Sequence, residues 1–176
     1  MSYYFSVCTT EMYQQKHILF LLENYKDLGL PYPFPLTLSL IASPLLMERE
    51  SFLCFNEDHE VIGAFSYIFG TGEMQYEDRE VVQIQAVFIR EEYRGSRVFL
   101  MALQFMTEYI TFMGEDVREV RFWASDDVLL RRLFSKIADR VSSVDSAFGP
   151  LDEYHAPFAA WQAYASRFRH EPFFPS

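Results

Sequence analysis

Three arginines and a glycine lie close together in the stretch REEYRGSRVF, residues 90–99, directly before a segment with an apolar helical pattern. Gly95 has no Cβ to keep an anion away from the backbone, and Arg90, Arg94 and Arg97 supply positive charge. A helix N-terminus adds outward N–H groups and a partial positive charge, which together suit a phosphate. The stretch predicts an anion-binding loop, with a solvated turn before a helix as an equal alternative.

Composition limits what that anion can belong to. The chain of 176 residues carries a formal charge of -10 with a pI near 4.8, which argues against a nucleic-acid backbone as partner and favours a cationic small molecule. Half of the residues are apolar, so we expect one domain, residues 1–176, with one core. Cys8 and Cys54 form no metal-binding or disulfide pattern, and no apolar run is long enough for a membrane span. These features favour a cytoplasmic protein without a metal, a membrane or a nucleic acid as partner.

Apolar periodicity and turn residues predict the elements that position the basic stretch. The three prolines of residues 31–35 predict an extended loop, either a spacer or a rigid wall that carries Tyr32 and Phe34 beside an acceptor pocket. Residues 36–48 predict at most short helical pieces. Ser125 is expected to cap a helix that runs to about Ile137. The predicted strands are 3–9, the two arms of a hairpin with its turn at 56–60, then 80–89, 117–124, 140–148 and 152–158, and the other helices are 11–25, 98–113 and 159–168. This order predicts a mixed α/β fold.

The loop and its setting resemble the GNAT superfamily of acetyl-CoA-dependent N-acetyltransferases. In the sequence IREEYRGSRVF, Tyr93, Arg94 and Gly95 match the family pattern in which a strand leads through an arginine–glycine loop into a helix. The resemblance implies a mostly antiparallel twisted sheet of about six or seven strands, flanked by helices, with two splayed central strands. It also implies acetyl-CoA, or another acyl-CoA, as the co-substrate.

The resemblance assigns residues to that co-substrate. Backbone groups of Val87, Phe88 and Ile89 would pair with pantetheine, and Ser125 or Asp126 would reach its thiol end. The pyrophosphate would bind at the loop and the start of the helix, at Arg94, Gly95, Ser96, Arg97, Val98 and Phe99.

Three positions depart from the family pattern. Arg97 and Phe99 stand where the family keeps small residues, so Phe99 must point into the core or obstruct the cofactor. Phe134 stands at about the place of the family's general-acid tyrosine, and a phenyl ring cannot donate a proton. These departures support an alternative to the enzyme, a catalytically degenerate GNAT-fold module that binds CoA or a protein.

Acetyl transfer by direct attack in a ternary complex needs a neutral amine, an oxyanion donor and a proton for the leaving thiolate. Tyr154 is the candidate acid and its neighbour His155 the candidate base, although at most one of them faces the slot because they alternate along a strand. Gln85, on the same face as Gln83 by the two-residue period, could orient water or the acceptor. The acceptor is expected to be a small-molecule or peptide amine, and the acidic residues Glu73, Glu77 and Asp78 favour a cationic one. Aromatic residues near the C-terminus, Trp161, Tyr164, Phe173 and Phe174, could cover a second subunit and form a homodimer.

Overall fold

The computed structural model describes residues 2–30, 32–46, 50–95, 97–146 and 149–174. The described strands form one open sheet in the order β1-β2-β3-β4-β5-β7-β6, in which the β4–β5 pair is parallel and the other pairs are antiparallel. The predicted mixed α/β fold with a mostly antiparallel sheet is confirmed. The strands are β1 Tyr4–Val7, β2 Glu50–Phe55, β3 Val61–Phe69, β4 Val81–Ile89, β5 Glu119–Ser125, β6 Asp139–Ser146 and β7 Gly149–Pro157.

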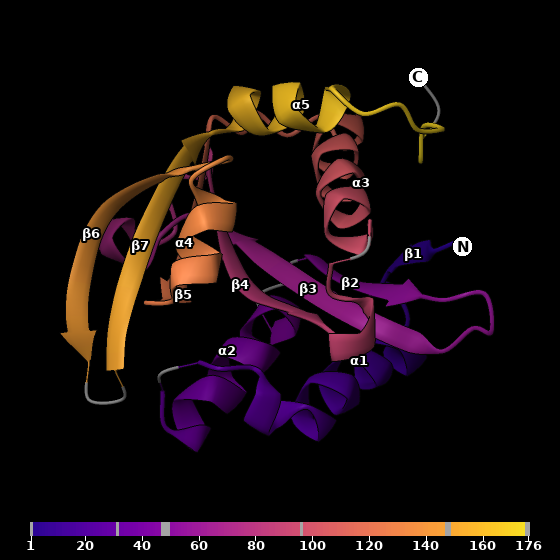
Figure 1. Ribbon diagram of the computed structural model, residues 1–176, viewed down its shortest axis with the longest axis horizontal. Helices are drawn as coiled ribbons and strands as arrows, with labels where there is room; N and C mark the ends of the chain where they lie inside the picture. Colours follow the sequence, from indigo (N-terminus) through magenta and orange to yellow (C-terminus); the bar gives the residue numbers. More distant parts are fainter. Residues whose placement is uncertain (1, 31, 47–49, 96, 147–148, 175–176) are drawn as a thin grey trace.

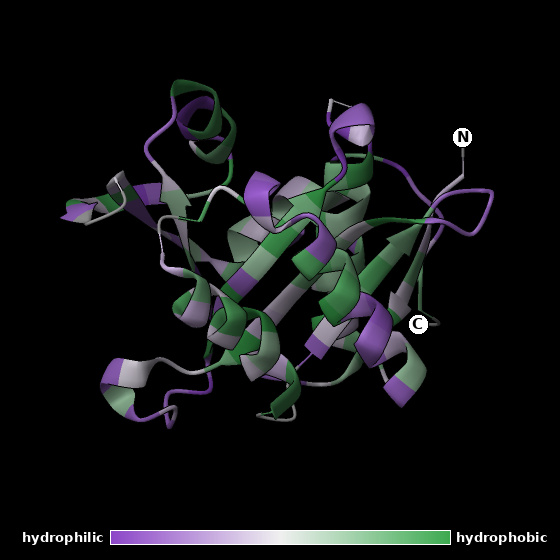
Figure 2. Cartoon of the chain, turned by 90° about the horizontal axis from the view of Figure 1, so that it is seen from below, coloured by the Kyte–Doolittle hydropathy of each residue, from purple (hydrophilic) through white to green (hydrophobic). Residues whose placement is uncertain are grey.

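Helices cover both faces of this sheet (Figure 1). The α-helices are α1 Glu11–Glu23, α2 Phe34–Leu46, α3 Val98–Phe112, α4 Val128–Phe134 and α5 Phe158–Ser166, with short 3-10 turns at Tyr25–Asp27, Gly72–Met74 and Glu91–Tyr93. Helices α1 and α2 lie together below the half of the sheet formed by β1 to β4, and Figure 2, which shows this side, draws their ribbons with both green and purple segments. Helices α3, α4 and α5 lie on the opposite face.

Each face of the sheet carries a large apolar cluster. One contains Ile41 of α2, Phe20 of α1, and Ala86 and Phe88 of β4. The other is larger and joins α3 and α5 to alternate residues of β5 and β7, among them Val120, Phe122, Tyr154 and Ala156. Side chains alternate across a strand, so Glu119, Arg121 and Trp123 of β5 point to the face of α1 and α2, as do Glu153 and His155 of β7.

Helix α2 corrects the prediction of short helical pieces after a proline loop. It is continuous through Phe34–Leu46 even though Pro44 lies within it. Pro35 is in the first turn, where a missing N–H costs nothing. Pro44 is in the last turn and has no N–H to donate to the carbonyl oxygen of Leu40. The hydroxyl of Ser43 donates to this oxygen at 3.4 Å in its place. Phe34 therefore begins a helix and is not part of an extended wall.

The aromatic residues near the C-terminus are used within the chain. Trp161 is buried, and its Nε1 donates to the carbonyl oxygen of Ile137 at 2.8 Å. Phe173 and Phe174 pack on α3, with ring centroids 5.3 Å and 5.2 Å from that of Phe105. Their presence is thus explained without a second subunit, and the homodimer remains a prediction.

Candidate active site

The parallel pair β4–β5 opens partway along its length. The two strands are paired only at Val81↔Glu119, Val82↔Val120 and Gln83↔Arg121, although β4 continues to Ile89 and β5 to Ser125. Beyond Gln83 the strands therefore diverge, as the view in Figure 1 also shows. Beyond Gln83 this edge of β4 is not paired with β5, and Val87 is 49% exposed; we call the region between the diverging strands the opening.

A β-bulge lies at the same place. The register of β3 with β4 pairs Ser66 with Ala86 and Tyr67 with Ile84, so Gln85 is the extra residue. Ile84 belongs to the cluster under α3, whereas Ala86 belongs to the cluster under α1 and α2. The bulge thus interrupts the two-residue period on which the shared face of Gln83 and Gln85 was predicted.

The arginine–glycine loop follows β4 directly and is held by its own side chains. Arg94 is exposed, its Nε donates to the carbonyl oxygen of Ile89 at 2.7 Å, and its guanidinium lies 5.1 Å from the ring centroid of Phe88. Asn56, in the hairpin turn, donates to the hydroxyl of Tyr93 at 3.0 Å and ties that turn to the loop. The loop is therefore attached to two parts of the sheet.

Gly95 has the open backbone that an anion site needs. Its φ of +81° lies in the left-handed region, and a Cβ added there would have no heavy atom within 4 Å. Ser96, which the resemblance assigns to the pyrophosphate, lies outside the described residues.

Helix α3 begins immediately after this loop. Arg97 is exposed and precedes the helix, and Val98 is buried against Cys54 and Ile62. Phe99 is half-buried and packs on the large cluster beneath α3. Of the two alternatives for Phe99, the structure supports the one in which its ring packs on the core.

The residues after β5 differ from their predicted roles in helix capping. Asp127, and not Ser125, caps α4, because its carboxylate accepts from the N–H groups of Leu129 and Leu130 at 2.8 Å and 3.0 Å. Ser125 donates to the carbonyl oxygen of Gly29 at 2.8 Å, which attaches the end of β5 to the segment between α1 and α2. Asp126 accepts from Arg131 at 2.8 Å. Whether Asp126 reaches a cofactor stays a prediction.

Tyr154, the predicted acid, lies on the α3–α5 face and is 1% exposed. Its ring stacks on Phe122 at 5.0 Å and meets the edge of Phe134 at 5.3 Å. Its hydroxyl has no hydrogen-bond partner among the described residues. Burial raises the pKa of Tyr154, and Asp152 adds to this, so the hydroxyl keeps its proton at neutral pH.

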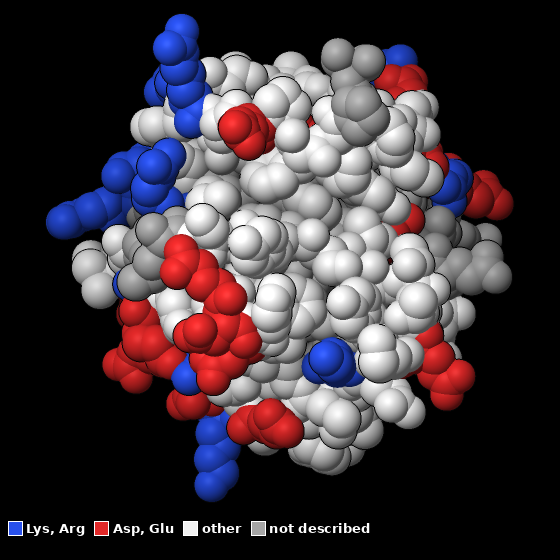
Figure 3. Space-filling view, turned by 90° about the vertical axis from the view of Figure 1, so that its right-hand side faces the viewer, with Lys and Arg blue, Asp and Glu red and all other residues white. Residues whose placement is uncertain are grey.

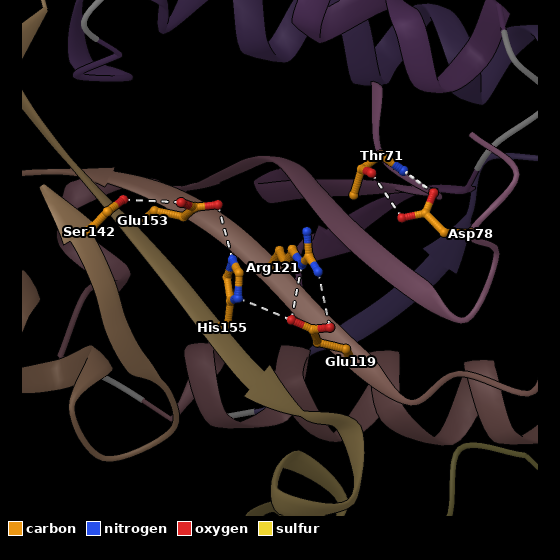
Figure 4. A network of polar contacts seen from close by, with 7 residues as sticks. All are labelled: Thr71, Asp78, Glu119, Arg121, Ser142, Glu153 and His155. Carbon is orange, nitrogen blue, oxygen red and sulfur yellow. Dashed lines mark hydrogen bonds and ion pairs between the residues drawn. The ribbon is translucent and has the colours of Figure 1, made fainter. Parts of the chain in front are cut away.

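His155 points to the other face, into a group of charged side chains that we call the β5–β7 cluster: Glu119, Arg121, Glu153 and His155 (Figure 4). His155 Nδ1 lies 3.1 Å from Glu119 and Nε2 lies 3.0 Å from Glu153. Arg121 makes two contacts with Glu119, at 2.9 Å and 3.2 Å. The hydrogen bonds and nearby carboxylates raise the pKa of Arg121, with Glu119 the largest influence. The four side chains are between 22% and 30% exposed, so water and small solutes can reach them.

Sequence reasoning identified His155 but missed its three partners. Arg121 and His155 are directly opposite each other in the β5–β7 register although they are far apart in the sequence. The available signal was the alternation of polar and apolar residues in VREVRFWA and DEYHAP, which places Glu119 with Arg121 and Glu153 with His155 on single faces. The strand pairing that joins the two faces could not be read from either segment.

Charged side chains are unevenly placed on the surface. On the side of the molecule that carries β1, acidic and basic groups gather at the edges around an uncharged middle (Figure 3).

Cys8 and Cys54 are buried and free, and burial raises the pKa of each thiol to about 12, as expected for core residues. No described helix is long and apolar enough to cross a membrane. The described residues include no cluster of histidine, cysteine and carboxylate groups that could hold a metal ion.

Comparison with known proteins identifies the fold. No protein-family model matches the chain, and no match was found among curated proteins. Among solved structures, a GNAT-family protein from Desulfovibrio desulfuricans has a TM-score of 0.67 at 10% identity, covering 89% of this chain and 99% of that one. Ribosomal-protein-S5-alanine acetyltransferase from Vibrio fischeri has a TM-score of 0.65 at 10% identity (92% and 96% covered). A variant of spermidine N-acetyltransferase from Vibrio cholerae has a TM-score of 0.64 at 8% identity (92% and 98% covered). The chain has the GNAT fold, and these structural neighbours are acetyltransferases.

Proposed function

We propose that the protein is an N-acetyltransferase that transfers an acetyl group from acetyl-CoA to a primary amine by direct attack in a ternary complex. The observation that carries this proposal is the divergence of β4 from β5 beyond Gln83, on the strand that is followed in the chain by the Gly95 loop and the start of α3. A fold shared with acetyltransferases supports it.

The residues present fit an acyl-CoA. The opening beside Val87, Phe88 and Ile89 offers backbone groups to pantetheine, and Gly95 leaves room for a diphosphate at the helix N-terminus. Arg94 and Arg97 are exposed at the loop and supply positive charge. When bound, acetyl-CoA supplies the activated acyl carbon, and the chain supplies position, exclusion of water and proton transfer.

Two side chains are proposed to act near the reacting atoms. Tyr154 would give its proton to the leaving thiolate; the raised pKa of its hydroxyl keeps that proton in place at neutral pH, although it also makes the group a weaker acid. Gln85, the bulge residue at the mouth of the opening, would orient the amine or a water molecule. The acceptor is proposed to be a cationic amine, in keeping with the acidic chain and with the spermidine acetyltransferase among the structural neighbours.

Titration calorimetry with CoA and acetyl-CoA, with Gly95→Ala and Gly114→Ala as a matched pair, tests the first half of the proposal. Both glycines have a positive φ and open space around a Cβ, so alanine costs each a similar strain. Only Gly95 lies in the loop, and we expect its variant to weaken acetyl-CoA binding by roughly tenfold or more, because a Cβ keeps the diphosphate away from the backbone. Equal affinities for both variants would contradict the proposed site.

A thiol-release assay over a panel of amines tests the second half. Release of CoA that depends on an amine supports the enzyme. Tight binding of CoA without release under any amine would favour the alternative, a CoA-binding module, for which Phe134 at the place of the family's tyrosine is the specific observation.

A further inference from the structure

The β5–β7 cluster lies at the level of the sheet where β4 and β5 part. Gln83 and Arg121 are the last pair between those strands, and His155 is opposite Arg121 on β7. The cluster is on the face of α1 and α2, whereas the loop at Gly95 leads into α3 on the other face. A molecule at the cluster and one bound along the loop would therefore approach the opening from opposite faces of the sheet.

The composition of the cluster indicates its ligand. Two carboxylates, Glu119 and Glu153, flank one imidazole, with a second cation in Arg121. A neutral imidazole has one N–H, so His155 can donate to both carboxylates only when both ring nitrogens carry a proton. In that form the four charges within the cluster cancel, and Asp78, which also influences Arg121, is a further carboxylate nearby. If His155 loses its proton, the cluster has one uncompensated negative charge, which a single cation can neutralise.

We propose that the β5–β7 cluster binds the protonated primary amine of a cationic acceptor between Glu119 and Glu153, and that His155 removes its proton before acyl transfer. The proposal rests on the proposed function and adds to it the acceptor's binding residues and the base. An ammonium group has three N–H donors and can satisfy two carboxylates at once. Arg121 holds Glu119 in place, and Ser142 does the same for Glu153 by donating to it at 3.1 Å.

The proton and bond changes balance. The ammonium ion loses one proton to neutral His155, and the free amine attacks the thioester carbon, forming an N–C bond. The C–S bond breaks, and the thiolate takes up one proton from solvent; Tyr154 and His155 point to opposite faces of the sheet, so this step does not depend on Tyr154. The second proton of the former ammonium ion leaves to solvent as the amide forms, and His155 returns its own proton to solvent. Apart from the two substrates, no further reactant is needed.

Spermidine and n-butylamine serve as cationic probes and glutamate as an amine with net negative charge. Their binding is measured by calorimetry without acetyl-CoA, together with the ¹⁵N shifts of the imidazole of His155. We expect both cationic probes to bind, glutamate not to bind, and the His155 ring signals to move. Glu153→Gln should raise the Kd of spermidine by roughly tenfold or more, because it removes a charged hydrogen bond.

Steady-state assays with acetyl-CoA separate binding from proton removal. Glu153→Gln should act mainly on KM for the amine, whereas His155→Gln should lower kcat by roughly a hundredfold, the usual contribution of a general base. His170→Gln is the matched control, because His170 is also a half-buried histidine paired with a glutamate, but this partner is Glu108 of α3, on the opposite face of the sheet from the cluster. It should behave as the parent protein.

The outcomes separate this inference from the proposed function. If acetyl-CoA binds and is turned over while His155→Gln and Glu153→Gln perform like the parent, the inference is wrong and the acetyltransferase stands. The inference is also wrong if spermidine or n-butylamine does not bind to the protein. If the parent protein does not bind acetyl-CoA, the proposed function is wrong, and the role of His155 as base is wrong with it.

Discussion

At the scale of single residues, Tyr154 and Phe134 form one aromatic contact that bears on the proton donor. Phe134 lacks the hydroxyl that the resemblance expects on α4, and its ring meets that of Tyr154 edge to face. The hydroxyl in this aromatic group therefore belongs to Tyr154 on β7, where it is buried without a partner among the described residues. A buried hydroxyl that makes no hydrogen bond costs stability, so its presence calls for a role outside folding.

Removal of that hydroxyl should harm catalysis and spare the fold. We expect Tyr154→Phe to lower kcat by roughly a hundredfold, as for loss of a general acid, while the free energy of unfolding stays equal or rises. Tyr109→Phe is the comparison, because the Tyr109 hydroxyl bonds to Glu50 at 3.1 Å and its loss should reduce stability. Thiol-release kinetics and urea unfolding measure the two effects. Unchanged kcat with reduced stability in Tyr154→Phe would show a purely structural tyrosine.

At the scale of elements, features set by neighbouring residues could be predicted from the sequence, whereas features set by pairing with a distant strand could not. The hairpin around Asn56–Glu60, the strand before Arg90 and the start of α3 were predicted because glycine, turn residues and periodicity lie within a few positions of each other. The bulge at Gln85 was not, because it exists only relative to β3. The continuity of α2 was missed because Pro44 was read as a helix breaker, although a proline in the last turn can be accommodated.

Besides the packing of Phe134 on Phe122 and Tyr154, an ion pair with a buried carboxylate attaches helix α4 to the sheet. Arg131 donates from Nε and Nη2 to Asp152 at 2.8 Å and 3.2 Å, and Asp152 is 0% exposed. Ser143 donates to the same carboxylate. The hydrogen bond from Arg131 lowers the pKa of Asp152. The two partners are in different surroundings, since Arg131 is partly open to water and also reaches Asp126.

This difference predicts unequal effects of removing either partner. Arg131→Met removes the guanidinium that hydrogen-bonds the buried carboxylate of Asp152 and leaves only the weaker influence of Arg140, which is the expensive way to break such a pair. In Asp152→Asn the amide oxygen can still accept from Arg131 and Ser143, and Arg131 keeps Asp126. We expect the midpoint of urea unfolding to fall roughly twofold further in Arg131→Met than in Asp152→Asn. A larger loss in Asp152→Asn would show that Asp152 acts chiefly through its charge.

At the scale of the whole molecule, the two helical layers meet the sheet with different chemistry. The layer under β1 to β4 buries a titratable group, His17 of α1, which is 0% exposed. Its Nδ1 lies 3.2 Å from the carbonyl oxygen of Phe52, while Nε2 has no partner among the described residues. Burial lowers the pKa of His17 to about 4, against which the bond to Phe52 acts weakly. The imidazole is therefore neutral in the folded protein at pH 7.

Acid should then destabilise the fold through His17. Below the ordinary histidine pKa of about 6.5 the unfolded chain takes up a proton that the folded chain does not, so stability is lost as the pH falls toward 4 and the loss then levels off. The shift corresponds to about 3 kcal/mol in total. Urea unfolding between pH 4 and 7 should show a smaller loss in His17→Leu than in the parent. His59→Asn is the control, because His59 is exposed in a turn at φ 60° and asparagine tolerates that backbone. If His17→Leu loses as much stability in acid as the parent protein, a group other than His17 causes the loss.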